Sequence, residues 1–429
     1  MQVFSFEADK GDGYNGGLVL AFFHFRRFLS MHVQSDICVI GNGAIGKVTA
    51  LGFAQAGHKV TLLAPPAGVR TEASPAQAPG WDVRVYALNH TAHALLSSLR
   101  VWDALDASRV AAVDAMDVNG DGEQAGNLMF DAYGARAGAL AWIVEDANLN
   151  RALDAALRFA ANVSVVHGRA ARLSSGGECA TVTLDNGDVL EASLLVGADG
   201  GQSWVRGQCD IGIDYRPYHQ QAVVTNFEGA LPHQGVAYQW FTSAEGIVAL
   251  LPLPGQRVSL VWSAPDALAE TLMRESLPQL AQRLAPFAAA KLGQLRPVEP
   301  EAVKSFPLAL IRPHAITAPR VALVGDAAHV VHPLAGHGMN LGFGDVATLL
   351  KLVAEREAQR DCGDARILAR YARARKEEIM LMQLATDGLA RLFAIDFEPL
   401  RVARNAGLSL LDKLPFVKRN LVAHAVGKR

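Results

Sequence analysis

The stretch Asp36-Ile37-Cys38-Val39-Ile40-Gly41-Asn42-Gly43-Ala44-Ile45-Gly46 decides the fold of this chain. Its apolar run is typical of a strand that is buried on both faces of a parallel sheet. Residues Ala44–Gly57 have helical composition and end at a glycine suited to a C-terminal cap. Residues Lys59–Leu63 form a second apolar run, so the sequence predicts an opening β-α-β unit.

The glycines between the first strand and the helix predict a dinucleotide site. Gly41 permits a tight turn, Gly43 lets the backbone approach a pyrophosphate, and Gly46 allows the helix to pack closely on the strand. Ala44 and Ile45 begin the helix, whose free N–H groups favour an anion. A glycine-rich turn without a ligand is the alternative interpretation.

One expected part of a dinucleotide site is missing at the end of the second strand. An acidic residue usually binds the ribose there, but this chain has Ala64. Alanine cannot accept a hydrogen bond, so ribose would need backbone groups, water or an arginine such as Arg70.

A second glycine-rich loop, Gly197–Arg206, also follows an apolar strand. Asp199 and Arg206 are its candidate ligand-facing residues. The alternative is a simple strand-to-helix turn in which Asp199 caps the helix.

A third loop extends from Gly325 to Gly342 and is rich in glycine. Asp326 can accept hydrogen bonds from a polyol, and a helix that begins near Gly338 would direct its positive end at the bound group. Both features suit a flavin, because a helix N-terminus can stabilise the negative charge of the reduced ring.

Length and composition bound the remaining possibilities. A chain of 429 residues with a formal charge of −2 predicts two or three globular domains and no nucleic-acid partner. Cys38, Cys179, Cys209 and Cys362 have no metal-ligand or redox spacing, which favours a reducing cytoplasm. The early apolar run Gly17–Phe25 is too short to span a bilayer.

The order of the patterns predicts an α/β protein with a discontinuous, Rossmann-like FAD-binding domain and a mixed or antiparallel-sheet substrate domain. Alternating runs between Gln221 and Trp262 predict the antiparallel sheet, with a substrate wall as its expected role. The expected ranges are a tail or misassigned start at 1–34, the FAD-binding domain at 35–107, 145–208 and 300–350, the substrate domain at 108–144 and 209–299, and a helical C-terminal region at 351–429.

The three loops, in this order, resemble those of the class A flavoprotein aromatic hydroxylases with the p-hydroxybenzoate hydroxylase fold. Further segments resemble the FAD-dependent hydroxylases of ubiquinone biosynthesis, and the resemblance extends over about Ser35–Gly427. These segments are Asp82–Leu88, Ala249–Leu253, Gly325–Asn340, Tyr371 with Arg375, and Arg404–Leu408.

The resemblance implies FAD as cofactor and NAD(P)H as electron donor. It assigns the pyrophosphate to the first glycine motif, a further cofactor contact to Arg84, the ribityl chain to Asp326 beside Gly325, and both FAD and transient NAD(P)H to Asp199 and Arg206. The residues expected to border the isoalloxazine are Pro333, Gly336, Gly338, Met339 and Asn340. Departures from the family pattern are Ala64, His337 in place of a common glutamine, and Gly344 in place of a charged residue.

The implied reaction is hydroxylation of an aromatic ring with O2 through a flavin C4a-hydroperoxide, and a polyprenylated phenol of ubiquinone biosynthesis is the expected substrate. No catalytic base is identified. The alternatives are a flavin dehydrogenase or reductase, a hydroxylase of another aromatic such as a quinolone, and a non-catalytic scaffold subunit. Proteins of ubiquinone biosynthesis are the implied partners.

Two surface or loop features have competing interpretations. His329, His332 and His337 are expected to line the flavin cleft rather than bind a metal, because suitably spaced carboxylate or cysteine ligands are absent from the loop. The basic, leucine-rich stretch from Arg401 to Arg429 is either an amphipathic helix at an anionic membrane or a solvated helix that covers the core. The expected location is the cytoplasm, with peripheral contact at the inner face of the membrane as the membrane alternative.

Overall fold

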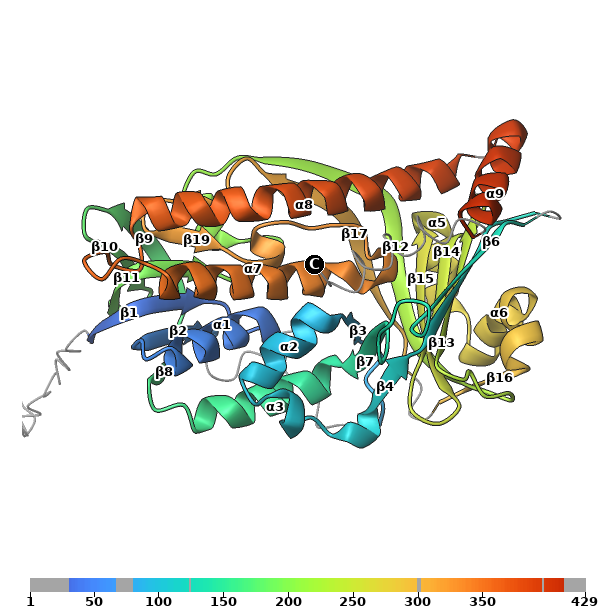
Figure 1. Cartoon of the computed structure of the whole chain (residues 1–429), viewed down its shortest axis with the longest axis horizontal. Helices are drawn as coiled ribbons and strands as arrows, with labels where there is room; N and C mark the ends of the chain where they lie inside the picture. Colours follow the sequence, from blue (N-terminus) through green and yellow to red (C-terminus); the bar gives the residue numbers. More distant parts are fainter. Residues whose placement is uncertain (1–30, 67–79, 123–124, 299–301, 396, 413–429) are drawn as a thin grey trace, which may run out of the picture.

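The structure is a computed structural model, and it describes residues 31–66, 80–122, 125–298, 302–395 and 397–412 (Figure 1). The first thirty residues of the expected N-terminal tail (1–34), the candidate Arg70 and the basic residues after Asp412 lie outside the described ranges. The last three residues of that expected tail belong instead to the first strand, which begins at His32.

The first sheet has the strand order β18-β19-β11-β1-β2-β8 and is parallel from β19 to β8. The predicted β-α-β unit is confirmed, since α1 connects β1 to the neighbouring parallel strand β2. The later strands β8, β11 and β19 belong to the same sheet. The bounds are β1 His32–Ile40, β2 Val60–Ala64, β8 Val163–His167, β11 Val189–Gly197, β18 Thr317–Ala318 and β19 Val321–Leu323.

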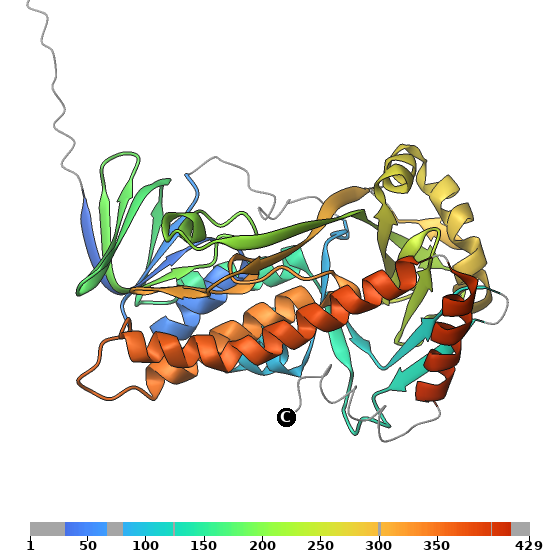
Figure 2. The same ribbon diagram turned by 90° about the horizontal axis from the view of Figure 1, so that it is seen from above.

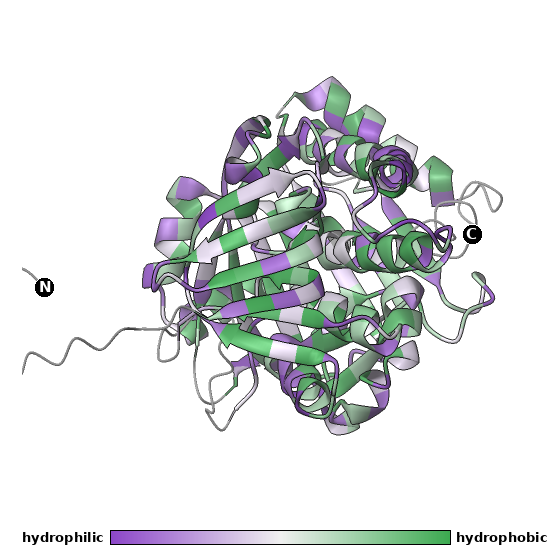
Figure 3. Cartoon of the chain, turned by 90° about the vertical axis from the view of Figure 1, so that its left-hand side faces the viewer, coloured by the Kyte–Doolittle hydropathy of each residue, from purple (hydrophilic) through white to green (hydrophobic). Residues whose placement is uncertain are grey.

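Alternate residues of β1 face two separate apolar cores. Ile37 and Val39 pack with helices α1, α2, α3 and α7, whereas Cys38 and Ile40 pack with β9, β10 and α4 on the other face. Figure 3 shows this end of the molecule, where the strands alternate in hydropathy as β10 alternates in burial. The bounds are α1 Ala44–Gln55, α2 His90–Ser98, α3 Asp146–Arg158, α4 Trp204–Gln208, α7 His337–Ala354, β9 Ala170–Gly176 and β10 Cys179–Leu184.

The second sheet has the order β16-β12-β15-β14-β13-β5-β6, and β17 also pairs with β12. Its central pairs are antiparallel, as predicted, and helices α5 and α6 cover one face through a core around Trp262 and Leu280. The bounds are β5 Ala115–Asn119, β6 Asn127–Asp131, β12 Ile213–Gly229, β13 Val236–Thr242, β14 Gly246–Pro252, β15 Arg257–Pro265, β16 Leu295–Pro297, β17 Lys304–Pro313, α5 Asp266–Arg274 and α6 Leu277–Leu292.

Strand β17 lies in the range that we expected for the FAD-binding domain, yet it pairs antiparallel with β12. The reason is the length of β12, whose first half extends beyond the second sheet toward the first (Figure 1). The full set of domain boundaries stays a prediction. A small sheet of β3 Val85–Leu88, β7 Ala141–Glu145 and β4 Val110–Val113 completes the strands, and short 3-10 turns occur at Trp102–Ala104, Ala107–Arg109, Gly325–Ala327 and Leu334–Gly336.

The described part of the C-terminal region, up to Asp412, is mainly helical, as predicted. Helices α7 and α8 (Ala365–Ala394) lie side by side, and α8 extends from the first sheet to the second (Figures 1 and 2). Helix α9 (Glu398–Asp412) packs on β6. None of the described helices combines the length and the apolarity needed to cross a bilayer.

Candidate functional site

The first and second glycine loops touch each other. Gly41 has a φ of 121°, which favours glycine, and a Cβ atom there would lie 2.2 Å from the carbonyl oxygen of Ala198. The start of the second loop, at Ala198 and Asp199, therefore packs directly against the backbone of the first motif. A side chain at position 41 would separate them.

The third loop meets both of the others. A Cβ atom on Gly325 would lie 3.3 Å from Ile45 Cγ2 in the first motif. From the second loop, Arg206 Nη1 donates to Ala327 O at 3.0 Å and Nη2 donates to Gly201 O at 2.7 Å. The predicted convergence of the three loops is confirmed.

Two helices begin at this convergence without side-chain caps. The N-cap residues, Gly43 of α1 and Gly336 of α7, are glycines and so have no side chain that could cap the helix. Neither helix has an acid in its first turn. Beyond their immediate chain neighbours and their own helix, Cβ atoms on Gly43 and Gly338 would meet no atom of the described residues within 4 Å. Open space beside uncapped N–H groups suits an anionic or electron-rich ligand, so these residues fit a flavin dinucleotide.

Asp326 combines solvent access with a deep position in the protein. Its side chain is exposed, yet burial among the surrounding atoms raises the pKa of its carboxyl, against the opposing effects of His329 and Arg84. The Arg84 guanidinium lies 5.7 Å from the centre of the Tyr86 ring and 5.6 Å from that of Phe306. An accessible acceptor held near a fixed cation is the arrangement that a polyol with an adjoining phosphate requires.

A buried charged group holds the third loop, and the sequence analysis missed its centre, Asp345. This carboxylate accepts hydrogen bonds from Gly325 N at 2.9 Å and Arg375 Nε at 2.7 Å, and its Oδ2 lies 2.6 Å from His329 Nε2. Burial alone would raise the pKa of Asp345, but His329 and Arg375 outweigh it and lower the pKa. The signal that was available is the only acid in a mainly apolar helix, because a buried carboxylate needs a cation or hydrogen-bond donors nearby.

Tyr371, on the same helix as Arg375, reinforces this arrangement because its hydroxyl donates to Leu323 O at 2.8 Å. The expectation that His329 lines the cleft is wrong, since its ring is fully buried against Asp345. The side chain of His337 lies outside the described part. Among the described residues, no group of three or more His, Cys, Asp or Glu side chains surrounds a common metal position.

The side chains of Asn340 and Asp199, two of the predicted cofactor residues, make hydrogen bonds within the protein. Asn340 Oδ1 accepts from Asn89 N at 2.9 Å, and its Nδ2 donates to Ala87 O at 2.8 Å, so Asn340 attaches the start of α7 to β3. Asp199 Oδ2 accepts from Val205 N at 3.0 Å in the first turn of α4, but the N-cap residue of this helix is Ser203, whose side chain accepts from Arg206 N. Its Oδ1 is buried and has no partner within the described ranges.

Arg206, 6% exposed, joins the second loop to the third rather than facing open space. Pro333 and Met339 are half-buried beside the start of α7. Ala64 is buried at the end of β2, as the sequence indicated.

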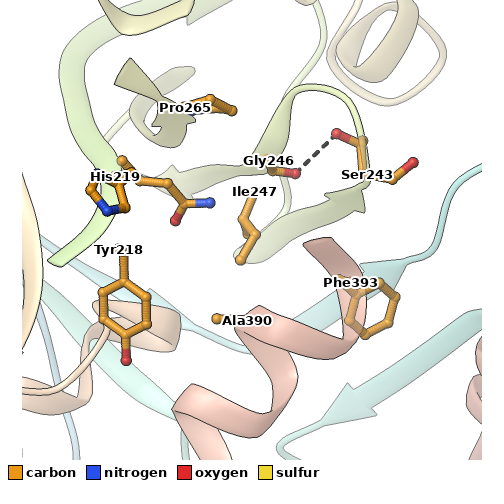
Figure 4. Close-up of a pocket in the computed structure, with 10 residues that line it drawn as sticks. Tyr218, His219, Ser243, Gly246, Ile247, Pro265, Ala390 and Phe393 are labelled. Carbon is orange, nitrogen blue, oxygen red and sulfur yellow. Dashed lines mark hydrogen bonds between the residues drawn. The ribbon is translucent and has the colours of Figure 1, made fainter. Parts of the chain in front are cut away.

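A pocket of about 220 Å³ lies next to the third loop, between the second sheet and α8 (Figure 4). Its connection to the loop is His332, whose Nε2 lies 3.1 Å from Gln220 Oε1 and whose ring stands edge-on to Tyr218 at 4.9 Å. The lining residues are Tyr218, His219, Gln220, Thr242, Ser243, Gly246, Ile247, Pro265, Ala390 and Phe393.

Proline explains why β12 contributes three successive residues to this pocket. The ladder with β17 pairs Pro217 with Ala309 and then resumes at Gln221 with Pro307, so residues 218–220 form a bulge. Neither proline has an N–H group to donate to a continuous ladder. The bulge, in which His219 has a φ of 55°, turns these side chains toward the pocket.

The second sheet also presents an apolar face to the third loop. Ala249 and Leu251 of β14 share one face with Val261 of β15, which pairs with Ala249. Ile247 on the same face packs with Leu334 of the third loop. Ala249, Leu251 and Val261 are only half-buried, so this face has accessible apolar surface near the cofactor loops.

His332 predicts a specific pH dependence of stability. Burial lowers the pKa of His332 to about 4, from an ordinary value of 6.5. Between these values the unfolded chain binds a proton that the folded chain does not, so the free energy of unfolding falls as pH decreases from 6.5 to 4. The slope due to one such group is about 1.4 kcal/mol per pH unit.

We expect His332→Gln to remove that slope while its amide keeps the contact with Gln220. The measurement is the free energy of unfolding by urea in the absence of added FAD, at intervals between pH 4 and 7. An identical slope in the variant and the parent protein would contradict the assignment.

The comparisons with known proteins agree with this geometry. Residues 34–383 match the family described as "FAD binding domain". The chain is 34% identical to the ubiquinone hydroxylase UbiL of Rhodospirillum rubrum over 397 residues, covering 92% of this chain and 90% of that protein. It is 33% identical to the 3-demethoxyubiquinol 3-hydroxylase of Escherichia coli over 402 residues, covering 92% and 98%.

The fold is shared with the p-nitrophenol 4-monooxygenase PnpA of Pseudomonas putida, with a TM-score of 0.73 at 18% identity over 93% of this chain and 100% of the other. The predicted fold class is therefore confirmed. From the matched family and the two relatives, the chain belongs to the FAD-binding-domain family, in the group that contains the ubiquinone hydroxylases.

Proposed function

We propose that this protein is an FAD-dependent monooxygenase that uses NAD(P)H and O2 to hydroxylate an aromatic ring, with a polyprenylated phenol of ubiquinone biosynthesis as its substrate. The observation that carries the proposal is the convergence of three loops beside two uncapped helix N-termini, next to an accessible apolar wall. The ubiquinone hydroxylases among its relatives support the substrate class.

In this proposal the first glycine motif and the start of α1 hold the pyrophosphate of FAD. Asp326 accepts hydrogen bonds from the ribityl chain, and Arg84 adds a positive charge nearby. The ribose meets no acid at Ala64, so backbone groups or water would bind it. When bound, FAD supplies the redox chemistry, taking electrons from NAD(P)H and activating O2.

The chain's own groups then have three tasks. The N-terminus of α7 stabilises negative charge at the near end of the flavin ring, with Pro333, Gly336, Gly338 and Met339 around it. The second loop contributes to the transient binding of NAD(P)H. Its Asp199 has a carboxylate oxygen, Oδ1, without a partner among the described residues. Ala249, Leu251 and Val261 provide an apolar surface that orients an aromatic ring and excludes water.

We assign no catalytic base. Burial lowers the pKa of His332 to about 4 and raises the pKa of Tyr218 to about 12, so at neutral pH His332 is uncharged and Tyr218 keeps its proton. A histidine with so low a pKa is a weak base, and an aromatic ring that already has a hydroxyl group is electron-rich enough to react without one.

We also propose peripheral contact with a membrane through α8 and α9. Met380, Leu381 and Leu384 are exposed on one face of α8, and Val402 and Leu410 are exposed on α9. The opposite side of α9 covers the core, because Leu408 and Leu411 pack beside Phe393. A membrane-dissolved substrate would be reached from such a surface.

Cofactor binding and folding are separated by two glycines of the same motif. In Gly43→Ala the new Cβ meets no other described residue within 4 Å, so we expect the stability of the FAD-free protein to be kept while the Kd for FAD rises at least about tenfold. In Gly46→Ala the Cβ would lie 1.9 Å from Gly41 O, so the loss of unfolding free energy is about 1–3 kcal/mol. Flavin fluorescence titration and urea unfolding measure both; equal behaviour of the two variants would contradict the assignment.

The reaction itself is tested with labelled oxygen. We expect the purified protein to be yellow and, with NADPH, ¹⁸O₂ and a short-tailed demethoxyubiquinol, to give a phenolic product with one ¹⁸O atom by mass spectrometry. Oxidation of NADPH without label in the product would indicate a dehydrogenase or reductase. A colourless protein that does not take up FAD would indicate the scaffold role.

Membrane contact is measured by co-sedimentation with phosphatidylcholine vesicles that contain phosphatidylglycerol. We expect the full chain to sediment with them and Leu384→Glu to sediment less, because a carboxylate replaces exposed apolar surface. Leu231→Glu is the matched control, since Leu231 is an exposed leucine of the β12–β13 connection. Equal sedimentation of both variants would refute the role of α8.

A further inference from the structure

Arg404 of α9 is a buried arginine that none of the cofactor loops uses. Only 5% of its surface is exposed. Its Nη1 donates to Leu392 O at 3.1 Å and to Ile395 O at 2.9 Å, two carbonyl groups at the end of α8. These carbonyls lack partners within the helix, so the guanidinium closes the C-terminal end of α8.

The same guanidinium binds the connection between β5 and β6. Nη2 donates to both carboxylate oxygens of Asp121, at 2.8 and 3.0 Å. Asp121 Oδ2 in turn accepts hydrogen bonds from Ser243 N at 3.0 Å and Ser243 Oγ at 2.9 Å. Burial alone would raise the pKa of Asp121, but Arg404 and Ser243 outweigh it and lower the pKa, so the carboxylate is charged at neutral pH.

Both contacts of Arg404 lead to the wall of the 220 Å³ pocket. Ser243, held through Asp121, lines it from the turn between β13 and β14 (Figure 4). Phe393 lines it from α8, and the Arg404 guanidinium lies 5.1 Å from the centre of that ring. Phe393 packs on Phe241 at 4.4 Å, within the cluster that contains Leu334 of the third loop.

Close backbone contact prevents α9 from shifting to compensate. Asn405 Nδ2 donates to Asp121 O at 2.7 Å. A Cβ atom on Gly126 would lie 2.2 Å from Asn405 O, so the residue that precedes β6 approaches α9 as closely as glycine allows. The geometry around Arg404 is therefore fixed from two sides.

We propose that Arg404 is a positioning residue for the substrate pocket: by joining α8, Asp121 and the β13–β14 turn, it sets the wall formed by Ser243 and Phe393. The proposal rests on the proposed function, because it assigns this pocket to part of the aromatic substrate. The volume of 220 Å³ is below the roughly 300–1,000 Å³ of common ligand pockets. In this proposal the pocket therefore accommodates only one part of the polyprenylated substrate.

An ion pair suits this role better than a role in stability alone. Apolar side chains of similar volume often stabilise a core as well as a buried ion pair does, because they avoid the desolvation of two charges. The planar guanidinium instead offers donors in fixed directions, which orient two carbonyl groups and a carboxylate simultaneously. Its effect should appear in substrate binding more than in cofactor binding.

The test uses steady-state kinetics of the full-length FAD-loaded protein with NADPH and a short-tailed demethoxyubiquinol. We expect Arg404→Gln to raise KM for the phenol at least about tenfold, with kcat and bound FAD within about twofold of the parent protein. Arg404→Lys should recover part of the loss. Arg401→Gln is the matched control, because Arg401 lies three residues earlier on α9 and pairs with Glu398 at the surface.

Unchanged KM in Arg404→Gln would overturn the proposal, and so would kcat and FAD content falling in parallel with thermal stability. If Arg404→Gln does not fold, Asp121→Asn serves instead, since it weakens the same connection while keeping the side-chain shape. The same rise in KM is expected, and its absence is equally decisive.

Hydrogen exchange separates this proposal from the proposed function. In Arg404→Gln we expect faster amide exchange over residues 242–246 and unchanged exchange over 325–332. That result supports the positioning role whether or not the parent protein hydroxylates a phenol. If the parent protein hydroxylates no phenol, only the proposed function is refuted. Unchanged exchange at the β13–β14 turn would overturn the positioning role whatever the activity.

Discussion

The buried carboxylate of Asp345 is the constraint on which the candidate site depends. It connects the backbone of Gly325, the ring of His329 and the guanidinium of Arg375, and none of these contacts is exposed to solvent. A charge in this position is tolerated only because its partners neutralise it and satisfy its oxygens. The consequence is that the start of the third loop, from Gly325 to His329, is anchored to α7 by buried hydrogen bonds, and such fixed polar groups suit the electrostatic stabilisation of a bound flavin.

The two halves of the molecule contribute to the site by different means. The first sheet ends in loops whose glycines allow backbone to touch backbone, as between Gly41 and Ala198. The second sheet contributes side chains, through the bulge of β12 and the half-buried face of β14 and β15. His332 and Leu334 connect the two, since one contacts Gln220 and the other packs with Ile247. This division agrees with a cofactor held by backbone and a substrate selected by side chains.

The C-terminal helices join these halves from outside. Helix α8 provides Arg375 to the third loop near its start and Phe393 to the pocket near its end. Helix α9 then fixes that end through Arg404. A region that the sequence predicts only as helical thus contacts both the proposed cofactor loops and the proposed substrate pocket.

The sequence by itself determined the β-α-β opening, the antiparallel second sheet and the helical end, because hydrophobic periodicity and glycine position act over a few neighbouring residues. It also indicated that three loops share one ligand. Only the tertiary structure decided that Asn340 attaches α7 to β3, that Arg206 joins two loops, and that residues 218–220 bulge into a pocket. These outcomes depend on partners far away in the chain, such as Arg404 and Asp121, which are 283 positions apart. Local patterns contain no record of such pairs, since folding alone brings them within hydrogen-bonding distance.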